Sequence, residues 1–193
     1  IDTTLIWATP IKVSLPKEGK IITKPFFLKP DLIPFNHEIQ MDILLDPLQI
    51  SDHLGIYSYN PKKSDWTYLS SELYSDSLFI RTSISSGEIF AVIEEFNPPE
   101  LSEFTPYLDG TYYSSDLEHL SFSVYDTFAG IEGETDVIFK LDGKPVVFEY
   151  NSYQKKVRFP LKYNLTRGTH TLYVQASDKV GNMSIVKGEF FIQ

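Results

Sequence analysis

Apolar and polar residues alternate with a period of two along most of the chain, and a helical period is almost absent. The segment HEIQMDILLD, for example, places Ile39, Met41 and Ile43 on one face. Successive side chains of a strand point to opposite faces, so this pattern predicts a strand with one buried face. Runs of this kind recur about every 8–12 residues with turn-forming residues between them, a spacing typical of β-sandwiches and barrels.

Three predicted turns join neighbouring strands. GIYSYN and WTYLSS are short predicted strands that flank the loop PKKSD. In TDVIFKLDGKPVVFEYN, the pair Asp142-Gly143 lies between two alternating runs, and Asp-Gly is a strong hairpin signal. KKVRFPLKY predicts a further strand, with Val157, Phe159, Leu161 and Tyr163 alternating along it. Near the end, GTHTLYVQASD and SIVKGEFFIQ predict the last two strands, with a turn between them.

The segment FNPPEL predicts a domain boundary. Asn97 is followed by Pro98 and Pro99, and proline offers no N–H to a strand ladder and restricts the residue before it. Two prolines in a row form a short, stiff connector, after which the strand pattern begins again. The sequence therefore predicts an all-β chain of two tandem β-sandwich domains, residues 1–97 and 98–193.

Composition narrows the classes of function. The chain has 193 residues, of which 42% are hydrophobic and 15% aromatic, so it can build a packed core rich in strands. The formal net charge is −9, and no lysine or arginine cluster is longer than two residues. Nucleic acids and anionic membrane surfaces are therefore excluded as expected partners. The absence of cysteine excludes disulfides, thiolate catalysis and cysteine-bound zinc.

The ends and the hydropathy of the chain lead to two further expectations. No apolar run approaches the ~18 residues of a membrane-spanning helix, so we expect no membrane insertion. The chain begins at Ile1 without a methionine or a signal peptide, and we expect it to be a segment of a longer protein.

Catalytic motifs are missing from the sequence. H-E-x-x-H, G-x-S-x-G, the P-loop and G-x-G-x-x-G do not occur. We therefore expect no enzymatic activity. The remaining alternative is an enzyme whose residues are scattered along the chain, such as the separated carboxylates of a glycosidase.

The turn in ASDKVGNMS could have a purely structural role or could bind a metal ion. Asp178 can accept backbone N–H groups, Gly181 can adopt a positive φ, and Asn182 tolerates the left-handed region. Gly130, like Asp142 and Gly143, is also expected at a structural turn. The alternative is a calcium site in which Asp126 and Asp178 join other acids of the same end of the domain, among them Glu132, Glu134 and Asp136. Calcium takes six to eight oxygen ligands, and no EF-hand loop occurs, so we expect no cofactor, with Ca²⁺ as the possible exception.

Four aromatic residues are the candidate ligand-binding group of the first half. Alternation places Tyr57 with Tyr59 on one face of a strand, and Trp66 with Tyr68 on one face of the next. Exposed together, they would form a platform on which sugar rings or a partner protein could stack. Buried together, they would form the core that a small sandwich needs.

The second half resembles a bacterial immunoglobulin-like domain, on the basis of SFSVYDTFAGI, FKLDGKPVVFEY, RGTHTLYVQASDKVGN and GEFFIQ. The shared pattern is an Asp before a small-Gly-Ile turn, a DGK hairpin, a GTHT strand entry and A-x-D-x-x-G-N. The resemblance implies an immunoglobulin-like β-sandwich and no particular activity.

The first half, through LGIYSYNPKKSDWTYLSS and SSGEIFAVIEEFNPPEL, resembles a β-rich segment of exported bacterial proteins. Such segments precede immunoglobulin-like domains in the C-terminal accessory region of lysostaphin-type peptidases and in bacterial surface proteins. The zinc motif of those peptidases, H-x-x-x-D with H-x-H, is absent here. The resemblance implies a non-catalytic region of a larger protein.

These observations lead to one expected function and one alternative. We expect an extracytoplasmic spacer or docking region of a larger exported bacterial protein, in the periplasm, at the cell surface or secreted. Its partners would be other domains of the parent protein, or a protein or glycan of the cell envelope. The alternative is a carbohydrate-binding module that uses the aromatics around Trp66.

Overall fold

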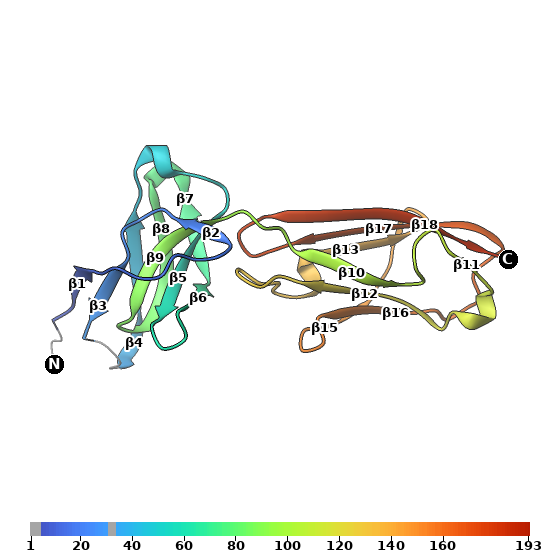
Figure 1. The fold of residues 1–193 in the computed structure, drawn as a ribbon, viewed down its shortest axis with the longest axis horizontal. Coiled ribbons are helices and arrows are strands. Elements are labelled where there is room, and N and C mark those ends of the chain that lie inside the picture. Colours follow the sequence, from blue (N-terminus) through green and yellow to red (C-terminus); the bar gives the residue numbers. More distant parts are fainter. Residues whose placement is uncertain (1–4, 31–33) are drawn as a thin grey trace. The chain divides into compact units, whose positions relative to one another are not determined.

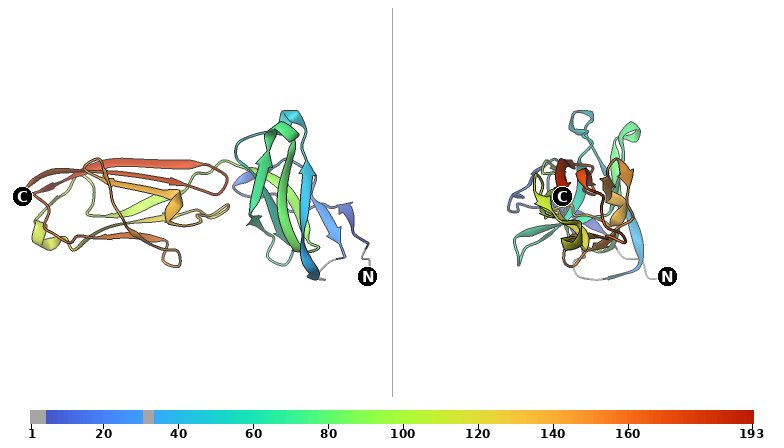
Figure 2. Two further views of the ribbon diagram at one scale, coloured as in Figure 1. Left: turned by 180° about the vertical axis from the view of Figure 1, so that it is seen from behind. Right: turned by 90° about the vertical axis from the view of Figure 1, so that its right-hand side faces the viewer.

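The computed structural model describes residues 5–30 and 34–193 and is almost entirely β, as the alternation predicts (Figures 1 and 2). Its contacts divide the chain into two compact units, residues 1–97 and residues 98–193, called here the first and the second unit. The helical elements of the described residues are 3-10 turns of three residues each, at Pro47–Gln49, Ser75–Ser77, Ser114–Asp116 and Glu134–Asp136. None of these is long or apolar enough to cross a membrane.

Two antiparallel sheets form the first unit. The larger sheet has the order β1-β3-β9-β5-β6, and β2 also pairs with β9. Its strands are β1 (Trp7–Pro10), β2 (Gly19–Ile21), β3 (Phe26–Lys29), β5 (Leu54–Asn60), β6 (Asp65–Leu69) and β9 (Ile89–Glu95). The smaller sheet has the order β4-β8-β7, formed by β4 (Pro34–Leu44), β7 (Ser71–Tyr74) and β8 (Phe79–Ser86).

The core of the first unit lies between these two sheets. Ile56 and Val92 of the larger sheet are buried in one cluster with Ile80 and Ile84 of the smaller sheet. The alternating apolar residues of HEIQMDILLD pack against this cluster, which confirms the predicted buried face of β4: Ile39, Met41 and Ile43. Alternation thus places one row of each strand in the core.

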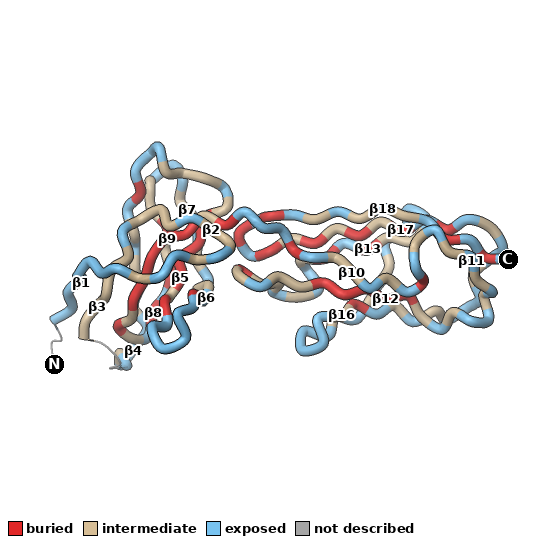
Figure 3. Tube along the Cα trace, viewed as in Figure 1, coloured by how far each residue is buried: buried red, intermediate tan, exposed pale blue. Residues whose placement is uncertain are grey.

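The opposite face of the larger sheet is covered too, and this corrects the sugar-platform hypothesis. Tyr57, Tyr59 and Trp66 are only 0%, 8% and 5% exposed, and Tyr68 is half-buried. Most of β5, which carries both Tyr57 and Tyr59, is buried (Figure 3). The segment after β1 lies against this face, because Trp66 Nε1 donates to the Ser14 carbonyl at 3.1 Å and the Tyr59 hydroxyl donates to Ser14 Oγ at 3.3 Å. Covered aromatics cannot stack on an incoming sugar ring, so these four residues serve packing.

Two sheets also form the second unit. One has the order β10-β12-β16-β15, from β10 (Glu100–Thr105), β12 (His119–Tyr125), β15 (Glu149–Asn151) and β16 (Lys156–Pro160). The other has the order β11-β18-β17-β13-β14, from β11 (Thr111–Tyr112), β13 (Val137–Leu141), β14 (Lys144–Pro145), β17 (Gly168–Ser177) and β18 (Met183–Ile192). β11 pairs with β18 in parallel, whereas the other pairs are antiparallel.

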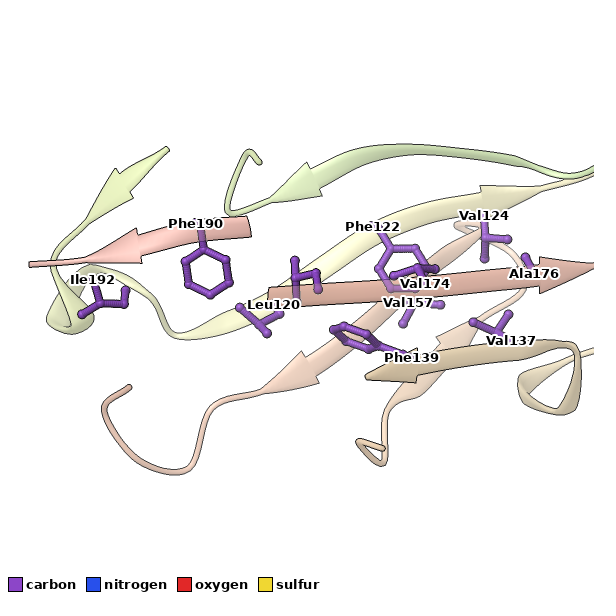
Figure 4. Close-up of a cluster of buried hydrophobic side chains, with 11 residues drawn as sticks. Leu120, Phe122, Val124, Val137, Phe139, Val157, Val174, Ala176, Phe190 and Ile192 are labelled. Atoms are coloured by element: carbon purple, nitrogen blue, oxygen red, sulfur yellow. The ribbon is translucent and has the colours of Figure 1, made fainter. Parts of the chain in front are cut away.

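Side chains from both sheets fill the core of the second unit (Figure 4). Phe122 of β12 lies edge-on to Phe139 of β13, with ring centroids 5.3 Å apart. Val157 of β16 and Val174 of β17 are fully buried beside them. Each of these strands therefore turns one row of side chains inward and leaves the other row on the outer surface.

The chain changes sheets after the predicted hairpin. Asp142 and Gly143 form the tip with φ values of +51° and +74°, and Leu141 pairs with Lys144 as the Asp-Gly signal predicts. The return strand β14 is only two residues long, and the residues after it cross to pair with β16 as β15. Val146 still donates its N–H to the Phe139 carbonyl at 3.1 Å, and beyond this residue the prediction that KPVVFEYN continues the hairpin is wrong. Tyr163, predicted in a strand, lies outside β16 and is exposed.

The predicted turn glycines adopt the left-handed region. φ is +89° at Gly181 and +83° at Gly130. Asn182 does not share this conformation and is instead buried, with its side chain donating to Asp178.

Replacing Gly181 with valine should lower the free energy of unfolding of the second unit by about 1–3 kcal/mol, because a β-branched side chain is strained at this φ. Chemical denaturation measures the effect. Gly133→Ala is the matched control, since Gly133 has an extended φ of 174° and open space where a Cβ would lie. The control should change stability by less than about 0.5 kcal/mol. An equal response of both variants contradicts the turn assignment.

Candidate ligand-binding site

A polar depression lies on the outer face of the β10-β12-β16-β15 sheet. Its volume is about 660 Å³, within the range of about 300–1,000 Å³ that ligand sites occupy. Nine residues line it: His119, Ser121, Glu149, Tyr150, Asn151, Ser152, Gln154, Lys156 and Arg158. They come from β12, from β16, and from β15 with the turn that follows it.

Strand register brings these side chains onto one face. Ser121 of β12 lies opposite Arg158 of β16, which in turn lies opposite Glu149 of β15. Residues opposite each other in an antiparallel pair have their side chains on the same face. Since the neighbouring Val157 points into the core, this row of three residues points outward.

A second outward row runs parallel to the first. Ser123 lies opposite Lys156, and Lys156 lies opposite Asn151. At its far end, the Ser123 hydroxyl donates to Glu103 Oε2 at 2.6 Å, and Lys156 Nζ lies 3.9 Å from the same oxygen. Lys156 is therefore held only weakly by Glu103, and it also lines the depression.

Arg158 is an exposed cation of the depression. The ion pairs among the described residues include neither Arg158 nor its cross-strand neighbour Glu149. Among the described residues, the hydrogen-bond partner of its side chain is His119, with Nη2 donating to Nδ1 at 3.4 Å. A guanidinium carries five N–H donors, so most of them remain available to a ligand.

His119 is neutral in this arrangement. Arginine can only donate, so Nδ1 of His119 must accept and cannot carry a proton. Burial lowers the pKa of His119, and the charges of Arg158 and Lys156 lower it further, against an opposing effect of Glu118. A neutral imidazole can thus orient the guanidinium without adding charge at neutral pH.

The turn between β15 and β16 forms one rim of the depression. Asn151 Oδ1 accepts the backbone N–H of Gln154 at 2.9 Å, and Lys155 adopts a φ of +54°. This geometry keeps the turn tight and places Ser152 and Gln154 at the edge of the depression. Tyr153, between them, is 95% exposed.

The charges and hydrogen-bonding groups of the depression are suited to binding a polar ligand. The depression combines two cations, one carboxylate, two amides and two serine hydroxyls, supplied by β12, β15, β16 and the turn between β15 and β16. Such a set can hold a polar ligand in a defined orientation. Its floor is Ser121, only 3% exposed.

No protein family matches this chain, and no curated protein matches it. Among solved structures it is similar to CopC from Methylosinus trichosporium OB3b, with 12% sequence identity and a TM-score of 0.39 over 49% of this chain and 93% of that chain. It is also similar to dimeric latent PorU from Porphyromonas gingivalis, with 11% identity and a TM-score of 0.34 over 92% of this chain and 23% of that chain. The chain thus spans less than a quarter of PorU, and these similarities identify no family.

The sequence-predicted binding residues lie elsewhere. Tyr57, Tyr59, Trp66 and Tyr68 belong to the first unit and contribute nothing to the depression. Conversely, no sequence motif pointed to Arg158 or the residues around it. The signal that could have found them is the polar row that alternates with core residues in HLSFSVY and KVRFP. Their pairing could not be read, because more than thirty positions separate the two segments.

Asp178 caps the turn between β17 and β18. Its Oδ1 accepts the backbone N–H groups of Val180 and Asn182 at 2.9 and 2.8 Å, and its Oδ2 accepts the Asn182 amide at 2.8 Å. Burial raises the pKa of Asp178, the bonds from Asn182 and Val180 oppose that rise, and the negative charge of Asp126 adds to it. The structural role predicted for this aspartate therefore has a full set of partners.

Asp126 caps a second turn in the same way. Its Oδ1 accepts the backbone N–H groups of Phe128 and Gly130 at 2.9 and 2.6 Å. Carboxylate oxygens of Asp126 and Asp178 lie within 4.8 Å of each other. Calcium binding by this pair stays a prediction of the sequence.

His170 is held between two acceptors inside the second unit. Nδ1 lies 2.7 Å from Asp142 Oδ2, and Nε2 lies 2.8 Å from the Thr166 carbonyl. Burial disfavours the charged ring, but the Thr166 carbonyl and the Asp142 carboxylate outweigh it and raise the pKa of His170. Asp142 also accepts the Thr171 N–H, so the hairpin tip is tied to β17.

The calcium hypothesis makes a measurable prediction. A divalent cation would offset the repulsion between Asp126 and Asp178, so millimolar calcium should raise the Tm of the chain relative to EDTA. The rise should disappear in Asp126→Asn. A Tm that is the same in calcium and EDTA contradicts the hypothesis and leaves the two aspartates as turn caps.

The His170–Asp142 pair should make stability depend on pH. Because the pKa of His170 is raised by folding, its contribution is fully present below about pH 6.5 and is lost as the pH rises through the folded-state pKa. The difference in unfolding free energy between the wild type and His170→Gln should therefore be larger at about pH 6 than at about pH 9. Denaturant titrations at both pH values measure it. A difference that does not change with pH shows that the imidazolium is not what the pair stabilises.

Proposed function

We propose that this chain is a non-catalytic interaction region, a spacer that also docks a ligand or partner, within a larger exported bacterial protein. The observation that carries the proposal is that each unit has its own sandwich core, formed by its own sheets. A chain of self-contained sandwiches can separate other domains while its outer surfaces remain available for contact.

Surface features of both units support the docking role. The second unit carries the polar depression around Arg158. The first unit carries a hollow of about 680 Å³ lined mainly by apolar side chains of residues 10–15 and 21–25, including Leu15, which is 79% exposed. Exposed apolar surface of this kind often marks an interaction site.

The strand order of the second unit supports an immunoglobulin-like assignment. The immunoglobulin fold has strands A, B, E and D in one sheet and strands C, F and G in the other. The first sheet here has the same order, with β10, β12, β16 and β15 as A, B, E and D. The second sheet contains β13, β17 and β18 as C, F and G. The resemblance of the second half to bacterial immunoglobulin-like domains points the same way. Together with the resemblance of the first half, it supports an extracytoplasmic location and partners in the cell envelope or in the parent protein.

Carbohydrate binding is the second candidate function, and we place it at the depression of the second unit instead of at the aromatics around Trp66. The hydroxyls, amides and charges of the depression are the groups that hold sugar hydroxyls, whereas the aromatics around Trp66 are covered.

Separate expression of residues 1–97 and 98–193 tests the proposed role. Because each unit has its own core, each piece should unfold cooperatively, with a Tm within a few degrees of a transition in the whole chain. Differential scanning calorimetry of the three proteins measures this. A piece that stays unfolded while the whole chain melts in one transition contradicts the picture of independent modules.

A further inference from the structure

Positive charge in the depression stands out on an acidic chain. The whole chain carries a formal net charge of −9. Nevertheless, Lys156 and Arg158 both point outward from β16, two positions apart. Arg158 forms no ion pair among the described residues, and Lys156 has one long contact with Glu103. A solvent-facing cation needs no partner, but two cations that share a depression with hydrogen-bonding groups favour an anionic ligand.

The geometry of Arg158 points to a carboxylate. A guanidinium presents parallel N–H donors that match the two oxygens of a planar carboxylate. His119 accepts from one Nη of Arg158 and thereby restrains the orientation of the group. Phosphate and sulfate share this chemistry but carry charge over three oxygens, and Glu149, directly opposite Arg158, would repel a densely charged group more than a single carboxylate.

The neutral groups of the depression point to a ligand rich in hydroxyls. Asn151, Ser152 and Gln154 line one side, and Ser121 forms the floor. These side chains donate and accept, as sugar hydroxyls do, and Glu149 can accept from a hydroxyl as well. A depression of about 660 Å³ is larger than a lone carboxylate needs.

We infer that the depression around Arg158 binds a saccharide that carries carboxylate groups, such as a chain of uronic acids. Arg158 and Lys156 hold the carboxylate, and the amides and hydroxyls hold the ring hydroxyls. The inference rests on the proposed interaction role and adds the ligand class to it. Ser121, Arg158 and Glu149 stand on strands of one sheet, so the charged part of the site needs little ordering on binding. Ser152 and Gln154 contribute from the turn between β15 and β16.

Calorimetric titration of the full chain with oligosaccharides of galacturonic acid tests the inference. Neutral galactose oligosaccharides of the same length, sulfated galactose oligosaccharides and a short polyglutamate peptide are titrated in parallel. The expected result is saturable binding of the uronic acid oligosaccharide, at least about tenfold tighter than that of the other three. The neutral oligosaccharide lacks the charged partner of Arg158, the sulfated one replaces the planar carboxylate, and polyglutamate keeps the carboxylate but lacks the ring hydroxyls. Binding should weaken as salt increases.

Variants locate the binding on the protein. Arg158→Gln should weaken binding about tenfold or more, and Arg158→Lys should restore it only in part, because lysine keeps the charge but not the planar donors. The matched control is Arg167→Gln, which removes the same charge from an exposed loop of the same unit and should leave binding unchanged. Gln154→Ala, on the exposed rim, should weaken binding a few-fold even if Arg158→Gln proves unstable.

Several outcomes overturn the inference. Equal loss in Arg158→Gln and Arg167→Gln means that the ligand follows overall charge. Equal binding of the neutral oligosaccharide shows that the site does not recognise the carboxylate. Tighter binding of the sulfated oligosaccharide or of polyglutamate assigns the site to another ligand class, and no binding of the uronic acid oligosaccharide to the wild type rejects the site. The proposed spacer and docking role fails only in the separate-expression experiment, so the two failures are distinguishable.

Discussion

The pairing of β12 with β16 is the contact on which the second unit and its candidate site both depend. Five consecutive residue pairs join the two strands, from His119 with Pro160 to Ser123 with Lys156. Two alternate pairs, Leu120 with Phe159 and Phe122 with Val157, face the core. They fix the register, since a slip by one residue would bring Arg158 into the core. The same register aligns Ser121, Arg158 and Glu149 on the outside. Packing on one face thus sets the geometry of binding groups on the other.

In the first unit, both faces of the larger sheet are buried, so both rows of its alternating side chains are packed. Its larger sheet is covered on both faces, by the smaller sheet on one side and by the segment around Ser14 on the other. An aromatic such as Trp66 therefore finds a packed environment and a partner for its indole N–H on a face that alternation alone would leave open. Consequently the aromatics of β5 and β6 pack inside the first unit, whereas Trp7 and Phe96 remain exposed.

Polar residues of the second unit are of two kinds. Some have their hydrogen-bonding groups paired within the protein, and others keep donors that are not paired. Asp178 accepts three hydrogen bonds within its turn, and His170 has an acceptor at each ring nitrogen. Arg158, by contrast, has one long hydrogen bond to a neutral histidine. Residues of the first kind stabilise turns, because leaving them unpaired when buried would cost free energy. A residue of the second kind retains donors for a ligand.

The sequence by itself determined the local features of this protein. Alternation in HEIQMDILLD predicted a strand and its buried row, and Asp142-Gly143 predicted a hairpin tip, because both signals depend on residues that are neighbours in the chain. Only the tertiary structure decided what covers each face and which strands pair. The burial of Trp66 depends on Ser14, 52 positions away, and the outward row around Arg158 depends on a strand 37 positions away. Contacts of this range follow from the packing of the whole unit, which no local pattern encodes.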